Sequence, residues 1–181
     1  MRHFFVTGLP RSRTAWWANL LTTPTSLCYH DVARFCRTPD DLPEVLSIGA
    51  GRYEATGNSD SSLLLVHERV MELFPEARWL VLKRDLDEAI DATMRVNFVK
   101  HEREVVQGVM KQGQEAMDAL MEREDPRVMS LTMEQMDDAE ECALAWEHLG
   151  LPGHLDLARF EILHELKIVI HESKYQEGYK R

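Results

Sequence analysis

The order of three segments near the start of the chain limits the folds available to it. A short apolar run comes first, a basic loop that begins with glycine follows, and a mostly apolar segment with the length of a helix comes third. Residues 4–7 are aromatic or β-branched, residues 8–14 read Gly-Leu-Pro-Arg-Ser-Arg-Thr, and residues 15–21 are mostly apolar. The pattern predicts a strand, a loop and a helix, with Ser12 as the N-cap of the helix. Such a loop brings free backbone N–H groups and the positive end of a helix to the carboxyl edge of a sheet, which makes it a candidate anion site.

Segments typical of strands and of helices alternate along the rest of the chain. Further strands are expected at residues 26–31, 78–84 and 127–132, while residues 53–57 fit either a strand or an irregular approach to a turn. Helices are expected at residues 39–47, 62–74, 86–95, 101–124, 137–149 and 155–170. Asp137 is the expected N-cap of the helix at 137–149. The alternation predicts one α/β domain over residues 1–181, with a mostly parallel sheet covered by helices on both faces and a polar tail at 172–181.

The charge balance and the cysteines restrict the partners and the compartment. With 31 acidic and 21 basic residues the net charge is -10, which argues against a nucleic-acid partner held by a broad positive field. Any polyanion must therefore meet a local basic cluster. The three cysteines are odd in number and form no CxxC pair, which favours a reducing, cytoplasmic location. No segment is apolar for long enough to predict a signal peptide or a membrane span.

The basic loop differs from the nucleoside-triphosphate P-loop. Counting the pattern GxxxxGK[ST] from Gly8 places Arg13 and Thr14 where the pattern has glycine and lysine. The clearest strand ends in Lys83 and Arg84 rather than in a carboxylate for magnesium. These features favour contact with phosphate without a metal, and none of the eight histidines belongs to an HExxH zinc motif.

Two segments resemble motifs of the sulfotransferases that use 3'-phosphoadenosine 5'-phosphosulfate (PAPS). Residues 7–16, Thr-Gly-Leu-Pro-Arg-Ser-Arg-Thr-Ala-Trp, are similar to the family's 5'-phosphosulfate loop, T-x-x-P-[KR]-S-G-T-[TS]-W. Residues 79–92 are similar to its 3'-phosphate motif, a hydrophobic strand ending R-[ND]-P-x-[DE] with a serine eight residues after the arginine. Residues 149–152, Leu-Gly-Leu-Pro, match a later family segment less specifically. The resemblance covers most of the chain and implies a P-loop NTPase-like three-layer fold.

The resemblance implies transfer of a sulfuryl group from PAPS to a hydroxyl or amine of a small-molecule or glycan-like acceptor, with PAP as the product and no metal. Arg11 takes the place of the residue that stabilises the leaving phosphate oxygen, and Arg84 that of the residue that holds the 3'-phosphate. The expected nucleotide-binding residues are Gly8, Leu9, Pro10, Arg11, Ser12, Arg13, Thr14, Ala15, Trp16, Arg84 and Thr93.

The chain departs from the family pattern at several positions. Arg13 replaces a glycine, so either the loop needs no positive φ there or Arg13 accepts a cost of about 1 kcal/mol and adds a cation. Ala92 replaces the serine of the 3'-phosphate motif and leaves Thr93, about 100° around the helix, as a substitute. Leu86 replaces the proline of the same motif, and the late Arg-Lys-Gly triplet of cytosolic members is absent. These changes put the preference for a 3'-phosphate in question.

The general base and the acceptor site have several candidates. His30, at the end of a predicted strand, could accept a proton with Asp31 as its orienting partner. Asp60 is the competing base, and Asp31, Glu54 or no base at all are further options. Acceptor contacts are expected from residues 31–56 and 97–124, the latter as a helical lid. The sequence also allows a kinase that uses ATP or a non-catalytic adenylate-binding or interaction module, and it leaves the oligomeric state open, a homodimer included.

Overall fold

A five-stranded parallel sheet forms the centre of the computed structural model, which describes residues 2–48, 50–96 and 101–166. Its strands are β1 Arg2–Gly8, β2 Ser26–His30, β3 Ala55–Ser59, β4 Arg78–Lys83 and β5 Val128–Thr132. They lie in the order β2-β3-β1-β4-β5. Residues 97–100 of the expected lid, the end of the expected helix 155–170 and the polar tail 172–181 fall outside the described residues.

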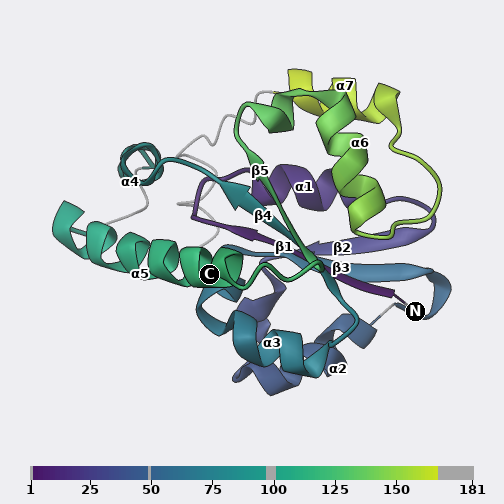
Figure 1. Ribbon diagram of the computed structural model, residues 1–181, viewed down its shortest axis with the longest axis horizontal. Coiled ribbons are helices and arrows are strands. Elements are labelled where there is room, and N and C mark those ends of the chain that lie inside the picture. Colours follow the sequence, from purple (N-terminus) through teal and green to yellow (C-terminus); the bar gives the residue numbers. More distant parts are fainter. Residues whose placement is uncertain (1, 49, 97–100, 167–181) are drawn as a thin grey trace, which may run out of the picture.

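Helices cover both faces of the sheet, as the alternating pattern predicts. The helices are α1 Thr14–Leu21, α2 Leu42–Ser47, α3 His67–Leu73, α4 Leu86–Met94, α5 Arg103–Glu122, α6 Ala139–His148 and α7 Leu157–Glu165. Figure 1 shows α1, α6 and α7 on one side of the sheet and α2, α3 and α5 on the other. The prediction of a three-layer α/β fold with a parallel sheet covered by helices on both faces is therefore confirmed. No helix within the described ranges is both long and apolar enough to cross a membrane.

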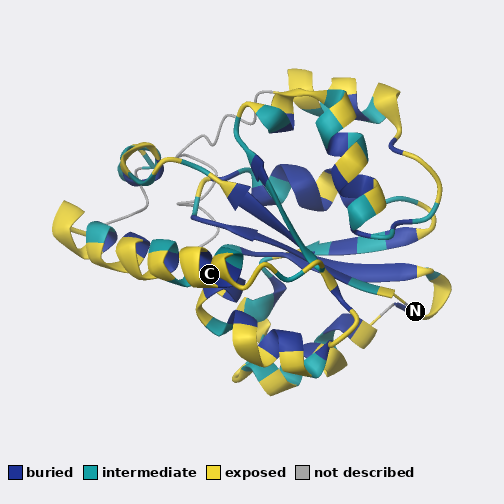
Figure 2. Ribbon diagram, in the orientation of Figure 1, coloured by how far each residue is buried: buried dark blue, intermediate teal, exposed yellow. Residues whose placement is uncertain are grey.

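The strands feed two hydrophobic cores because alternate side chains point to opposite faces of a sheet. Phe4 and Val6 of β1 belong to the core under α1 and α6, whereas Phe5 packs at 4.9 Å, between ring centroids, against Trp79 in the core on the other face. Figure 2 shows the central strands buried along most of their length. Burial on both faces explains why β1 and β4 read as continuous apolar runs rather than as alternating ones.

The connections that leave the carboxyl ends of the neighbouring strands β1 and β4 run toward opposite edges of the sheet. From β1 the chain crosses to β2 on one side, and from β4 it crosses to β5 on the other. Open α/β sheets bind ligands in the crevice at such a switch point. At its base Gly8 pairs with Leu82, and a Cβ atom on Gly8 would lie 2.5 Å from the Leu82 carbonyl oxygen.

Both expected N-caps differ from the structure. Ser12 is not the N-cap of α1: Arg13 is, because the Ser12 N–H turns back to the Leu9 carbonyl at 3.1 Å. Asp138 rather than Asp137 caps α6, accepting a 2.8 Å hydrogen bond from the Glu140 N–H.

The expected helix at 62–74 divides into a 3₁₀ helix, Ser61–Val66, and α3. Residues 53–57 contribute to a strand that lies two residues later, β3.

Gly8→Ala should lower the free energy of unfolding by about 2 kcal/mol or more, because the new methyl group meets backbone that cannot move without displacing β4. Urea denaturation measures the change. Gly108→Ala is the matched control: Gly108 lies within α5, its Cβ position is open, and alanine there should raise the helix stability by roughly 0.5–1 kcal/mol. Equal effects of the two substitutions would contradict the close approach.

Candidate functional site

The loop after β1 has two arginines in the left-handed region. Arg11 has φ 71° and Arg13 has φ 63° with ψ 24°. Of the two alternatives raised by the missing glycine, the structure therefore selects the one in which the loop needs a positive φ and Arg13 adopts it. The cost of about 1 kcal/mol is opposed by an ion pair between the Arg13 guanidinium and the Asp137 carboxylate.

The loop presents backbone donors without acceptors. Among the described residues, no acceptor lies within hydrogen-bond distance of the N–H groups of Arg11 or of residues 13–16. The Ser12 hydroxyl is fully buried and also has no partner there. Buried polar groups are nearly always hydrogen-bonded, and α1 adds the positive end of its dipole, so these groups make the loop a candidate anion site.

Arg84 reaches the loop from the end of β4. Its guanidinium Nη1 donates to the Arg11 carbonyl, which braces the loop in its left-handed conformation. Its Nε is buried without a hydrogen-bond partner and lies 3.8 Å from the Glu88 carboxylate. The structure thus brings Arg84 and Arg11 together.

A cleft of about 620 Å³ opens beside the loop. It is lined by Pro10, Arg11, Arg13, Thr14, Ala15, Trp16, His30, Asp31, Ser61, Asp137, Leu163, His164 and Leu166. Most of the predicted nucleotide-binding residues lie in this wall. Neither Arg84 nor Thr93 does; the Thr93 hydroxyl, on α4, is buried without a hydrogen-bond partner.

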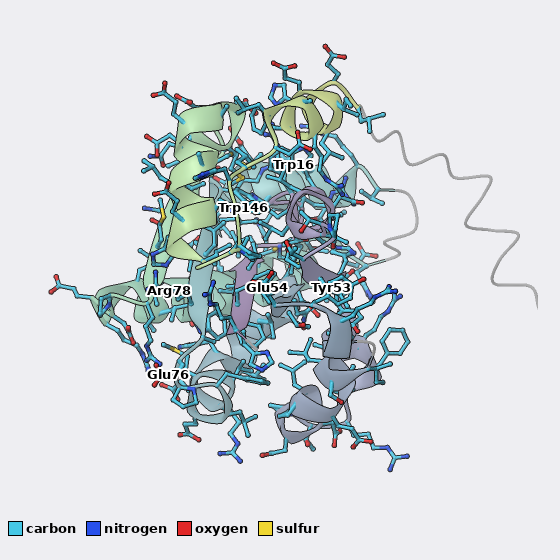
Figure 3. The ribbon with its side chains drawn as sticks, turned by 90° about the vertical axis from the view of Figure 1, so that its right-hand side faces the viewer. Trp16, Tyr53, Glu54, Glu76, Arg78 and Trp146 are labelled. Atoms are coloured by element: carbon cyan, nitrogen blue, oxygen red, sulfur yellow. The ribbon has the colours of Figure 1, made fainter. Side chains whose placement is uncertain are left out.

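Trp16 belongs both to the core and to the cleft. Its ring meets Trp17 edge-on at 5.3 Å and Phe160 edge-on at 5.8 Å, and only 8 % of the residue is exposed. Figure 3 shows Trp16 and Trp146 on the side of the sheet that α6 and α7 cover. A rigidly packed indole that borders the cleft offers an aromatic edge to a ligand without a cost in side-chain entropy.

His30 and Asp31 lie at the carboxyl end of β2, next to the loop. The His30 Nε2 is 3.4 Å from the Thr14 hydroxyl and 3.4 Å from the Asp31 carboxylate. Burial raises the pKa of Asp31; the nearby His30 opposes this shift and the carboxylate of Asp60 adds to it. The cleft therefore holds an imidazole with a carboxylate beside it, which is an arrangement suited to proton transfer.

Asp60 has a different environment from His30. It is 4 % exposed, and its carboxylate accepts from the Ser62 N–H at 2.8 Å, the Ser62 hydroxyl at 2.6 Å and the Ala33 N–H at 3.1 Å. The Asn58 amide lies at 3.5 Å. These donors occupy the carboxylate, so the geometry favours His30 over Asp60 as the base and gives Asp60 a capping role. Glu54 precedes β3 at the amino edge of the sheet, the edge that faces the viewer in Figure 3, far from the loop.

Sequence reasoning missed the wall of the cleft that comes from the end of the chain. Asp137, Leu163 and His164 face the loop, and the His164 Nδ1 is 3.7 Å from the Asp137 carboxylate. Arg13 and Asp137 are 124 positions apart, and no local pattern marks them as partners. The sequence signal for Asp137 is that of a helix cap, a role that its neighbour Asp138 takes.

Comparisons with known proteins identify the fold and no family. No family model and no curated protein matches the chain. Among solved structures, the crystal structure of shikimate kinase from Bacteroides thetaiotaomicron is similar, with a TM-score of 0.51 and 13 % identity over 83 % of this chain and 99 % of that one. The chain therefore shares the fold of a P-loop kinase.

Asp60→Asn should lower the free energy of unfolding by about 1–3 kcal/mol, because an amide NH₂ would face the N–H group of Ala33 or of Ser62. Chemical denaturation measures this change. Asp138→Asn is the matched control, since that exposed cap accepts a hydrogen bond that asparagine accepts as well. An Asp60→Asn variant as stable as the control would show that Asp60 does not hold the fold together.

Proposed function

We propose that this chain is a nucleotide-dependent transferase whose loop after β1 holds a phosphate of the donor, and that the donor is PAPS. The observation that carries the proposal is the loop itself, with unpartnered N–H groups, a buried Ser12 hydroxyl and the exposed Arg11. Arg11 forms no ion pair within the described part of the chain, so its charge is available to an incoming anion. Thr14 in the place of the P-loop lysine favours a sulfuryl donor over a nucleoside triphosphate.

The proposed reaction places charge where the loop can receive it. The acceptor oxygen or nitrogen forms a bond to the sulfur of PAPS, and the bond from sulfur to the 5'-phosphate oxygen breaks. PAP leaves with the electron pair, and Arg11 together with the loop N–H groups stabilises the new charge. His30 takes the proton that the acceptor loses, and the neighbouring Asp31 carboxylate stabilises the resulting imidazolium.

Arg84 is proposed to contribute to both the loop and the 3'-phosphate. A guanidinium has five N–H donors, so one can remain on the Arg11 carbonyl while others bind phosphate. The Nε forms no hydrogen bond with the described residues, and its neighbour is the Glu88 carboxylate at 3.8 Å. Thr93, whose hydroxyl is likewise unpartnered, is the proposed substitute for the serine of the 3'-phosphate motif.

A small-molecule kinase is the second candidate, and the fold favours it. One similar solved structure is a shikimate kinase, and Asp31 and Asp137 are carboxylates in the wall of the cleft. In this alternative the donor is ATP with magnesium. For either donor we propose a small-molecule or glycan-like acceptor and, from the three free cysteines, a cytoplasmic location.

Calorimetric titration with PAP, and separately with ADP and magnesium, distinguishes the candidates without an acceptor. Binding of PAP that does not depend on magnesium supports the sulfotransferase. Binding of ADP only with magnesium, and no binding of PAP, overturns it in favour of the kinase. PAP binding without turnover over a panel of acceptors would leave a non-catalytic adenylate-binding module, and binding of neither nucleotide overturns the donor site.

Arg11→Ala should abolish transfer and weaken PAP binding by about 1.5–3 kcal/mol, the range for a hydrogen bond to a charged group. Calorimetry measures the affinity. Arg52→Ala is the matched control, because Arg52 is equally exposed and lies before β3, outside the cleft. Unchanged PAP affinity in the Arg11 variant would overturn the assignment of the loop.

A further inference from the structure

A second, smaller cleft lies on the α2 and α3 side of the sheet. It has a volume of about 260 Å³, and apolar side chains dominate its wall, among them Leu42, Leu63, Val66 and Val70. Ligand pockets for drug-sized molecules have volumes of roughly 300–1,000 Å³, so a body of about one ring fills this one. The walls are rigid because Leu42, Leu63 and Val70 belong to the hydrophobic core.

Arg37 supplies a positive charge at this apolar cleft. It lines the cleft, is exposed, and forms no ion pair with any residue that the structure describes. The Asp41 carboxylate accepts from the backbone N–H groups of Thr38 at 3.0 Å and Arg37 at 2.7 Å, and these bonds, with a smaller contribution from the Arg37 charge, lower the pKa of Asp41. A guanidinium that forms no ion pair with the described residues and borders an apolar cavity fits a ligand with an apolar body and a carboxylate, which arginine can bind through two parallel hydrogen bonds.

The smaller cleft and the cleft beside the loop share a rim. Asp31 and Ser61 line the larger cleft, and Ala33 and Ser62 line the smaller one. The Asp60 carboxylate binds the N–H groups of Ala33 and Ser62 and so fixes both segments of the rim. Since consecutive Cα atoms are about 3.8 Å apart, the Cα of Ala33 lies within about 8 Å of that of Asp31, and the Cα of Ser62 about 4 Å from that of Ser61, so the walls of the two clefts adjoin.

We propose that the smaller cleft, lined by Leu42, Leu63, Val66, Val70 and Arg37, binds the acceptor, and that the acceptor is a small molecule with an apolar body of about one ring and a carboxylate that pairs with Arg37. The role as acceptor site rests on the proposed transferase function, whereas the binding of such a molecule does not. The positive charge also gives an anionic acceptor a local attraction on a chain whose net charge is -10.

Phenylacetate and phenylacetamide are the probes, because they share a shape and differ in charge. Cys36 lines the smaller cleft and is half-buried, whereas Cys28 and Cys142 are buried, so its alkylation by iodoacetamide reports occupancy. Burial raises the pKa of the Cys36 thiol, with further contributions from the carboxylates of Asp41 and Asp60, so labelling is followed by mass spectrometry at mildly alkaline pH.

Phenylacetate should protect Cys36 at a concentration about tenfold lower than phenylacetamide does, as expected for a charge-assisted contact. Arg37→Gln should remove this difference. Arg34→Gln is the matched control: Arg34 is also exposed, but it lies over the Phe35 ring and does not line the cleft, so the difference should remain. Val66→Phe fills the cleft and should abolish protection by both probes, with circular dichroism as the check of folding.

Equal protection by the two probes, protection by neither, or equal effects of the Arg34 and Arg37 substitutions would overturn the proposal. The assay contains no nucleotide, so its result is independent of the PAP titration. If the protein binds PAP but not phenylacetate, the proposed acceptor site is overturned and the proposed transferase function stands. If the protein binds phenylacetate but no nucleotide, the smaller cleft is a carboxylate-binding site, and its assignment as the acceptor site of a transferase is overturned.

Discussion

The close approach of β1 and β4 at Gly8 positions the two segments that carry Arg11 and Arg84. Because no side chain separates Gly8 from Leu82, the two central strands end side by side, and the loops that follow them diverge from one point. The loop of Arg11 and the side chain of Arg84 meet there. Two cations next to free N–H groups form a local positive site on an acidic protein, and the rest of the surface need not be basic to bind an anion.

Local pattern predicted the elements because strands and helices differ in the spacing of their apolar residues. The run at β4, the helix after the loop and the alternation of the two types led correctly to a sheet buried on both faces. Element ends were predicted less well. Ser12 has the residue type of an N-cap, but its N–H closes the turn to Leu9, and the next residue takes the capping position.

The candidate site was predictable only where its residues are close in sequence. Residues 8–16 and His30 follow strands that the apolar pattern reveals, and parallel strands bring such residues to one edge. Asp137 and the α7 wall depend on how α6 and α7 pack over α1, which no short pattern encodes. The sequence could not decide between Asp60 and His30 as the general base. The Asp60 carboxylate accepts hydrogen bonds from the N–H groups of Ser62 nearby and of Ala33, 27 positions away, and the second of these contacts depends on the fold.

The ion pair between Arg13 and Asp137 has a consequence for how the protein folds. It joins the loop after the first strand to a residue 124 positions later, just after the last strand of the sheet. Contacts that close long stretches of chain form late because of the entropy they cost. The left-handed conformation of Arg13 gains this partner only when the segment that carries Asp137 has packed against the loop. A nascent chain that ends after β3 already contains the loop sequence. It lacks Arg84, which donates to the Arg11 carbonyl, and Asp137, which pairs with Arg13.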